Sequence, residues 1–242
     1  MHNRNYRLLA CAAACALASV AAPALAEPSG EISSPVVVKG ETEIEAIYGR
    51  LSGGPDSGAD ILRLEASHSV TDKLRLAIRT EIERAPDEPR KLAAVSFEAI
   101  YEVGRVGGID LGLYGEYEAV RDGTDKLEGK VLLERRAGPF DARLNLIGAK
   151  PLTSGEPLEL GYAASADVEA IGELRLGVAA FGGLGSTRTF LSRADHFVGP
   201  VVKTEIEGLG PELEIELGYL FALGKAKDAS DGQFRLVLEM EF

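Results

Sequence analysis

Charged side chains recur at every second position in several stretches of the chain. In residues 74–84, Arg75, Arg79, Glu81 and Glu83 are separated by less polar residues. Paired carboxylates at this spacing can bind a cation weakly, and an arginine can bridge two carboxylates through charge-assisted hydrogen bonds. Residues two apart share one face of a strand, so the same spacing also follows from any strand with a polar face. The pattern predicts a charged surface and leaves open whether it attracts cations or only forms a solvated lattice.

Residues suited to catalysis or to tight ligand binding are sparse. His196 follows Ser192, Arg193 and Asp195, but close sequence neighbours rarely form a hydrolytic triad. The stretch GGLGST at 182–187 lacks the lysine that follows the glycines of a phosphate-binding loop. No cluster of histidine and cysteine has the spacing of metal ligands. We therefore expect no enzyme activity, no catalytic residues, no metal site and no cofactor.

The segments that carry the charged residues are predicted to form strands. Leu74, Leu76, Ile78, Thr80 and Ile82 alternate with the residues named above for 74–84. Such alternation places the apolar residues on one face of a strand, whereas a helix would scatter them. Residues 59–70 alternate in the same way, and the intervening VTDK is a turn signal, so these two segments predict a hairpin.

The pattern continues along most of the chain, with segments of about ten residues, the length of a tilted membrane-spanning strand. Short connections alternate with longer polar ones. We therefore predict an all-β fold, an antiparallel transmembrane β-barrel over 40–242 with about twelve strands, short periplasmic turns and longer extracellular loops. The expected strands are 40–50, 59–70, 74–84, 92–103, 109–120, 127–136, 140–149, 157–167, 173–182, 197–207, 212–223 and 233–242.

The first 26 residues have the pattern of a secretory signal peptide. Arg4 and Arg7 precede an alanine-rich apolar run that ends in Ala24-Leu25-Ala26. We expect cleavage before Glu27, followed by a periplasmic N-terminal segment over 27–39. A membrane anchor and a lipoprotein acylated at Cys11 or Cys15 are the alternatives.

The charge of the predicted mature chain argues against nucleic-acid binding. Residues 1–26 hold two arginines and no carboxylate, so their removal leaves 216 residues with 24 basic and 38 acidic side chains and a net charge of −14. Nucleic-acid binding needs a basic surface instead. Both cysteines lie in the removed segment, so the mature chain has no disulfide or thiol chemistry.

The last residues alternate as strictly as any in the chain. Phe234, Leu236, Leu238, Met240 and Phe242 share one face, and the sequence stops on the phenylalanine. This stretch resembles the terminal assembly signal of Gram-negative outer-membrane β-barrel proteins. The resemblance implies an outer-membrane location, contact with outer-membrane lipid and recognition by the barrel assembly machinery. A periplasmic lipocalin-like barrel and an antiparallel sandwich would also alternate and remain alternatives.

If the apolar face meets lipid, the opposite face lines the lumen. Acidic residues outnumber basic ones on that face, which predicts a passive, cation-preferring pore for ions or small solutes. The alternatives are a closed structural or adhesion barrel with function in its loops and, less favoured, an outer-membrane lipid-modifying enzyme. The predicted lumen residues are Arg63, Glu65, Arg75, Arg79, Glu81, Glu83, Glu98, Glu116, Glu118, Lys130, Arg143, Arg175, Lys203, Glu205, Glu214, Glu216, Arg235 and Glu239.

Overall fold

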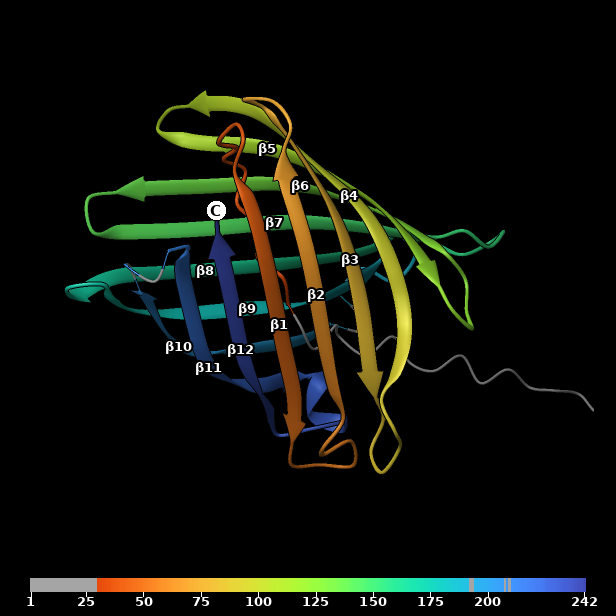
Figure 1. The fold of residues 1–242 in the computed structure, drawn as a ribbon. Helices are drawn as coiled ribbons and strands as arrows, with labels where there is room; N and C mark the ends of the chain where they lie inside the picture. Colours follow the sequence, from red (N-terminus) through yellow and green to blue (C-terminus); the bar gives the residue numbers. More distant parts are fainter. Residues whose placement is uncertain (1–29, 192–193, 207, 209) are drawn as a thin grey trace, which may run out of the picture.

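Antiparallel strands close into a barrel in the computed structural model, which describes residues 30–191, 194–206, 208 and 210–242 (Figure 1). Within these residues, the expected all-β fold and the expected twelve strands are confirmed. The strands are β1 (Thr42–Ser52), β2 (Asp60–Ser69), β3 (Leu74–Arg84), β4 (Lys91–Val106), β5 (Ile109–Val120), β6 (Lys126–Ala137), β7 (Phe140–Pro151), β8 (Glu159–Ile171), β9 (Leu174–Ser186), β10 (Asp195–Ile206), β11 (Glu212–Gly224) and β12 (Gly232–Glu241).

The barrel is closed by the pairing of its first and last strands. Ile44 lies opposite Met240 and Tyr48 lies opposite Leu236, while the other edge of β1 pairs with β2. Each strand therefore has two antiparallel neighbours, and the sheet has no free edge. No helix in the described part of the chain has the length and apolar character needed to cross a membrane.

The expected strand ends are wrong by up to four residues. Two strands show the largest difference. β8 was expected to end at residue 167 and continues to Ile171, and β9 was expected to end at residue 182 and continues to Ser186. Its glycine-rich end looks like a loop in the sequence, but it pairs with the start of β8, where Glu159 lies opposite Ser186. Pairing with a neighbour thus overrides the local turn signal.

The connections at the two ends of the barrel differ in length, as expected. One end, here the short-turn end, carries the connections 70–73, 107–108, 138–139, 172–173 and 207–211. The other, the long-loop end, carries 53–59, 85–90, 121–125, 152–158, 187–194 and 225–231, the last with a 3₁₀-helix, η1 (Lys225–Asp228). Gly107 and Gly108 form the tightest kind of turn, with φ of 60° and 84°. Such a turn needs positive φ at both central residues, which glycine adopts readily.

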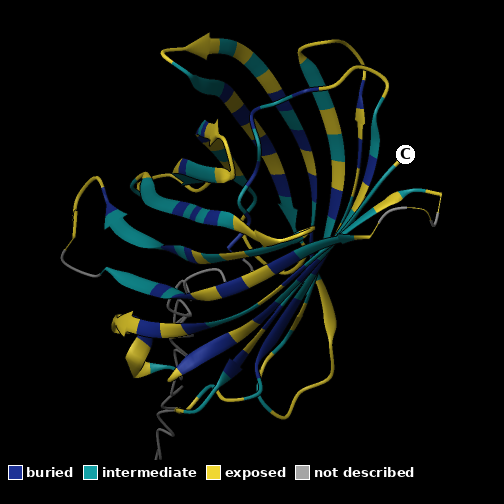
Figure 2. Ribbon diagram, turned by 90° about the vertical axis from the view of Figure 1, so that its left-hand side faces the viewer, coloured by how far each residue is buried: buried dark blue, intermediate teal, exposed yellow. Residues whose placement is uncertain are grey.

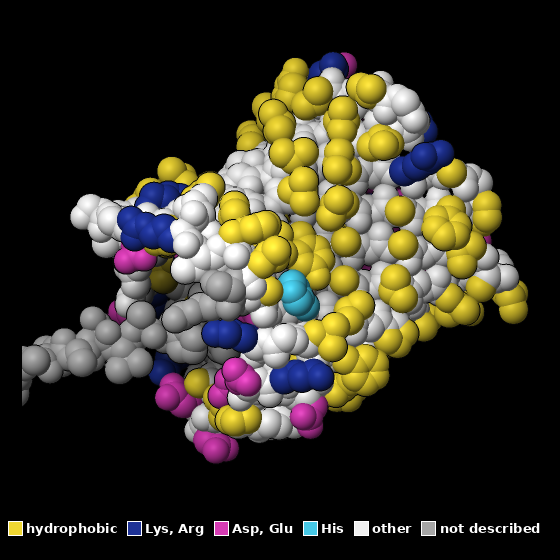
Figure 3. All heavy atoms as spheres, turned by 180° about the vertical axis from the view of Figure 1, so that it is seen from behind, with side chains coloured by type: hydrophobic (Ala, Val, Ile, Leu, Met, Phe, Trp, Pro, Cys, Tyr) yellow, Lys and Arg dark blue, Asp and Glu magenta, His cyan; other side chains and the backbone are white. Residues whose placement is uncertain are grey.

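Buried and exposed residues alternate along many of the strands (Figure 2). On β5, Leu113 is 51% exposed whereas its neighbour Tyr114 is 4% exposed. On β4, Phe97 is 57% exposed and Ser96 is 3% exposed. Hydrophobic side chains spread across the outer wall in Figure 3. The apolar face of the strands is therefore the outer face of the barrel, and the charged face is the inner one.

Residues 30–39, here the inner segment, precede β1, and residues 30–37 of this segment lie inside the barrel. Glu31, Ser33, Pro35 and Val37 are buried, and Gly30 comes so close to Phe181 that a Cβ atom would lie 2.1 Å from its ring. The expectation of a periplasmic segment over 27–39 stays a prediction. Residues 27–29 and the predicted signal peptide lie outside the described residues.

Apolar side chains fill part of the interior toward the long-loop end. Phe181 and Phe197 pack with ring centroids 5.6 Å apart, and Ile32 of the inner segment packs against the cluster they belong to. The buried members are Leu51, Ala59, Ala163, Ala179, Phe181, Phe197, Val201, Leu220, Ala222 and Ala226. The interior is thus charged over much of its wall and apolar in this region.

The outward direction of Leu238 generates a first prediction. We expect Leu238→Arg to reduce barrel assembly, because a charge near the middle of the apolar band costs about 2–4 kcal/mol. Leu223→Arg is the matched control, since Leu223 lies on the same outer face but beside the long-loop end, where the cost falls to about 0–1 kcal/mol. Heat-modifiable gel migration of membrane fractions measures assembly. Equal migration and yield for both variants would contradict an outer face in contact with lipid.

Candidate functional site

The inner wall gathers the charged residues that the sequence singles out. All eighteen predicted lumen residues lie on the face opposite the exposed apolar side chains. Glu83, near the long-loop end of β3, is exposed, whereas the others are buried or half-buried. The fully buried members are Arg63, Arg79, Glu98, Glu116, Glu118, Lys130, Lys203, Glu216 and Arg235.

Five glutamates form an acidic row across neighbouring strands. Glu205 lies opposite Glu214, which lies opposite Glu239 on β12. Glu239 lies opposite Glu45, and Glu45 lies opposite Glu65 on β2. Glu214 has Lys203 at 4.0 Å. Among the described residues, no basic side chain lies within salt-bridge distance of Glu45, Glu65 or Glu239, so these three carboxyl groups have no direct basic partner.

Arg79 on β3 is the centre of a buried ionic network. Its Nε atom lies 3.0 Å from Glu98, its Nη2 donates to Glu116 at 2.6 Å, and its Nη1 binds Glu31 of the inner segment. Lys130 on β6 lies 3.3 Å from the same Glu31 carboxylate. Glu31 therefore links two strands of the wall through their cations.

The electrostatics of Glu31 favour its ionised form. Burial raises its pKa, but Lys130 and Arg79 outweigh that effect and hold the pKa well below its ordinary value. A carboxylate whose folded-state pKa is lowered stabilises the fold above its unfolded-state pKa of about 4.3. That contribution is lost as the pH falls through the lower folded-state value, so the inner segment is held most firmly at neutral pH.

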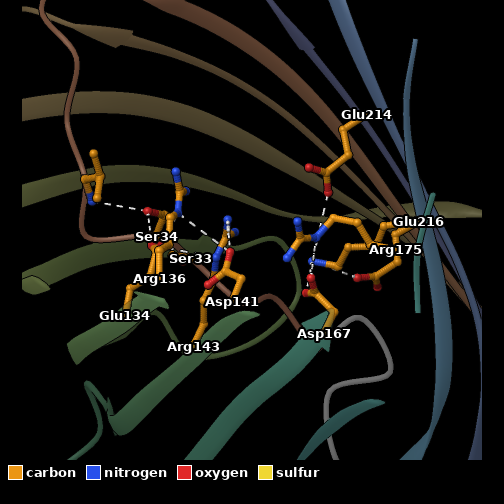
Figure 4. A network of polar contacts seen from close by, with 12 residues as sticks. Ser33, Ser34, Glu134, Arg136, Asp141, Arg143, Asp167, Arg175, Glu214 and Glu216 are labelled. Carbon is orange, nitrogen blue, oxygen red and sulfur yellow. Dashed lines mark hydrogen bonds and ion pairs between the residues drawn. The ribbon is translucent and has the colours of Figure 1, made fainter. Parts of the chain in front are cut away.

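Hydrogen bonds attach the rest of the inner segment to β4, β6 and β7. The Ser33 backbone N–H donates to Asn145 Oδ1 at 2.7 Å, and Asn145 Nδ2 donates back to the Ser33 carbonyl at 3.0 Å. Ser34 donates to Glu134, and the Val37 N–H donates to Glu102 at 3.0 Å. Figure 4 shows Ser33 and Ser34 beside the side chains of this wall.

A second ionic network lies on β8 to β12, shown at the right of Figure 4. Asp167 accepts a hydrogen bond from Arg175 at 2.5 Å and lies 3.5 Å from Lys203. Lys203 is also 3.5 Å from Glu216, which accepts from Arg235 at 2.7 Å. Arg175 also pairs with Glu169 at 3.2 Å, so three basic and three acidic side chains balance here, in contrast to the acidic row.

A cavity of about 230 Å³ opens between the inner segment and the acidic row. Its lining includes Glu43, Glu45, Glu65, Glu239 and Glu241, together with residues of the inner segment and three arginines. Because strand β1 starts and strand β12 ends at this level, the cavity lies toward the short-turn end. Glu43 pairs with Arg75, whereas Glu45, Glu65 and Glu239 have no such partner among the described residues. A cavity of this volume beside them can hold hydrated cations.

Carboxylate oxygens of Glu31, Glu65 and Glu98 lie within 4.8 Å of one another. This spacing would suit a metal ion. However, Arg79 binds both Glu31 and Glu98, and Lys130 binds Glu31. The two side-chain cations already supply the positive charge that a metal would bring, so the donor set does not fit a resident ion.

The residues considered for catalysis do not converge in the described part of the chain. Asp195 accepts a hydrogen bond from the Gly183 N–H at 2.9 Å, whereas His196 contacts Tyr162 on the outer face, with ring centroids 5.7 Å apart. Adjacent strand residues point to opposite faces, which separates this pair. Ser192 and Arg193 lie outside the described residues. The stretch 182–187 belongs largely to β9 rather than to a loop before a helix.

Known structures share this fold at low sequence identity. The KdgM porin matches with a TM-score of 0.55 and 10% identity, over 83% of this chain and 98% of that chain. An outer membrane channel from Pseudomonas putida F1 matches with a TM-score of 0.53 and 13% identity, over 85% of this chain and 96% of that chain. The sequence matches no protein-family model and no curated protein. These likenesses establish a shared barrel fold.

Sequence reasoning missed the inner segment and the apolar part of the interior. Glu31, Ser33 and Ser34 stand in a stretch without alternation, so no pattern assigned them a face. A signal for the apolar region does exist on β9, where Ala179 and Phe181 share the inner face with Arg175. A strand with apolar residues on both faces indicates that its inner face packs against other apolar side chains.

The Arg79 network generates a second prediction. We expect Arg79→Gln to lower the free energy of unfolding by about 3–5 kcal/mol, because it leaves buried carboxylates without their partner. Arg135→Gln is the control, since Arg135 is exposed on the outer face of β6, and a change within about 0.5 kcal/mol is expected. Urea unfolding of the refolded chain in detergent measures both. Equal small losses would show that the network contributes nothing to stability.

Proposed function

We propose that the chain is an outer-membrane barrel that forms a passive, cation-preferring pore for ions or small solutes. The observation that carries this proposal is the acidic row, in which Glu45, Glu65 and Glu239 face the interior without a basic partner among the residues that the structure describes. Carboxylates inside a narrow lumen are screened less than on an open surface, so they enrich cations and repel anions.

The exposed apolar outer face supports a location in the outer membrane. Closed barrels are the only β-structures that satisfy every backbone group in lipid. In such barrels the short turns face the periplasm and the longer loops face outward. The short-turn end would then be periplasmic, the predicted signal peptide would direct export, and the C-terminal residues 234–242 would be read by the barrel assembly machinery.

The inner segment sets the width of the proposed pore. Its contacts run from Arg79 on β3 to Phe181 on β9, so it crosses the interior between distant strands. A solute must pass between this segment and the acidic row, where the 230 Å³ cavity lies. KdgM porin has been solved in complex with oligogalacturonate. The unpaired carboxylates here would repel such an anionic chain, so we propose small cations and neutral solutes instead.

A closed barrel is the second candidate, and a specific observation favours it. The inner segment together with the apolar cluster around Phe181 and Phe197 fills the interior toward the long-loop end. If this filling is permanent, function would belong to the loops. A lipid-modifying enzyme is less favoured, because no catalytic arrangement exists among the described residues.

A third prediction tests selectivity in planar bilayers. We expect the mature chain to give a reversal potential with cation preference at about 0.1 M salt, where the Debye length is about 10 Å, and less preference at 1 M, where it is about 3 Å. Replacing Glu45→Gln together with Glu239→Gln should lower the preference at 0.1 M. Asp122→Asn, in the loop after β5 with a side chain 99% exposed, should leave it unchanged. An anion preference of the unaltered chain would contradict the assignment of selectivity to the acidic row.

A fourth prediction tests the inner segment. Deleting residues 27–38 from the mature chain should raise single-channel conductance several-fold, because the segment occupies the space beside the acidic row. The deleted chain must still show heat-modifiable migration, which verifies that the barrel has assembled. No conductance from either protein would establish the closed barrel, and equal conductance would show that ions do not pass the segment.

A further inference from the structure

A row of charged residues borders the apolar outer band at the long-loop end of β1 to β3. Arg50 lies opposite Asp60, and Asp60 lies opposite Arg84. On the same faces, the next residues toward the short-turn end are Tyr48, Leu62 and Ile82. The row is therefore the first charged level beyond the apolar band, and it faces outward rather than into the barrel.

Asp60 fixes two guanidinium groups in place. Its carboxylate has no exposed surface and accepts hydrogen bonds from Arg90 Nε at 2.9 Å and Arg90 Nη2 at 3.2 Å. It also pairs with Arg84. Arg90 lies 5.8 Å from the centre of the Tyr48 ring, in cation–π contact. The side chain of Arg90 is thereby drawn from its loop onto the outer rim of β1 and β2.

Arg50 adds a third guanidinium at the same place. Arg84 Nη2 donates to the Gly58 carbonyl at 3.5 Å, and Arg50 Nη2 lies 3.9 Å from the position that a Cβ atom of Gly58 would take. Arg50 and Arg84 thus approach the same residue from adjacent sides. Two guanidinium groups pair with one buried carboxylate and a third lies beside Gly58, so this group of residues carries a positive excess.

Hydrogen-bond donors in this group remain unused. Arg50 is exposed and forms no ion pair among the described residues. Arg84 keeps 30% of its side chain exposed although it pairs with Asp60. Of the acidic residues in the neighbouring loop 85–90, Glu88 is engaged by Lys91 at 2.7 Å. An incoming anion could therefore accept hydrogen bonds from Arg50 and Arg84 without displacing Asp60.

We propose that Arg50, Arg84 and Arg90 form a binding site for the phosphate group of an outer-leaflet lipid. Guanidinium groups bind phosphate through paired, charge-assisted hydrogen bonds, and they stay charged at any physiological pH. Basic residues at the level of the headgroups bind phosphorylated lipids in other membrane proteins. The apolar band directly below the row would contact the acyl chains of the same molecule, which a free phosphate ion cannot use.

This inference rests on the proposed outer-membrane location but does not depend on conduction. The test uses the refolded mature chain in detergent, with diphosphoryl lipid A, its dephosphorylated form and inorganic phosphate as probes in native mass spectrometry. We expect diphosphoryl lipid A to bind, and the other two to bind at least tenfold more weakly. Equal binding of both lipids would show that acyl contacts alone attach the lipid. Comparable binding of inorganic phosphate would show an anion site without lipid selectivity. Either result would overturn the proposal.

The matched variants are Arg50→Gln with Arg84→Gln, which keep the Arg90–Asp60 pair, and Arg135→Gln as an exposed outer-face control near the other end. We expect the double variant to bind diphosphoryl lipid A at least tenfold more weakly and the control to bind it normally. Heat-modifiable migration verifies folding of each variant. Unchanged binding by the double variant would overturn the site. Lost lipid binding with unchanged conductance would separate this site from the pore.

Discussion

The pairing of β1 with β12 is the constraint on which the rest of the structure depends. β1 pairs with β12 on one side and with β2 on the other, so Glu45 lies opposite both Glu239 and Glu65. This pairing closes the sheet and leaves no free edge. Once the sheet is closed, the period-two alternation sorts every strand residue to the outside or the inside. An apolar exterior and a charged interior then follow from the sequence of each strand, and the interior charges must be compensated within the barrel.

The interior charges are paired in some parts of the wall and lack partners in others. Asp167, Lys203, Glu216 and Arg235 form a balanced network on one part of the wall. Elsewhere Glu31 of the inner segment gives Arg79 and Lys130 of the wall an additional acidic partner. Buried charges are costly without partners, so the inner segment helps to satisfy the wall as well as to narrow the lumen. In the part of the chain that the structure describes, Glu45, Glu65 and Glu239 of the acidic row have no basic partner, and the proposed ion selectivity rests on them.

The strands were predictable because alternation is a local property of the sequence. Residues 74–84 show it clearly, and β3 has the expected bounds. The end of β9 was not predictable, since Gly183 and Gly185 become strand residues only through pairing with β8. The inner segment was not predictable either, because the hydrogen bonds between Ser33 and Asn145 join residues 112 apart in the chain. Most candidate lumen residues follow from period two, but which of them lack a partner depends on three-dimensional neighbours.

The central claim is that the apolar face of the strands contacts lipid and the charged face does not. Because the chain contains no tryptophan, single tryptophans can be introduced at the adjacent positions Leu113 and Tyr114, which are 51% and 4% exposed. Fluorescence quenching by lipids with brominated acyl chains then reports contact with the membrane interior. If the apolar face contacts lipid, quenching is strong for Leu113→Trp and weak for Tyr114→Trp. Quenching of Tyr114→Trp alone, or of neither variant in a folded barrel, would contradict it.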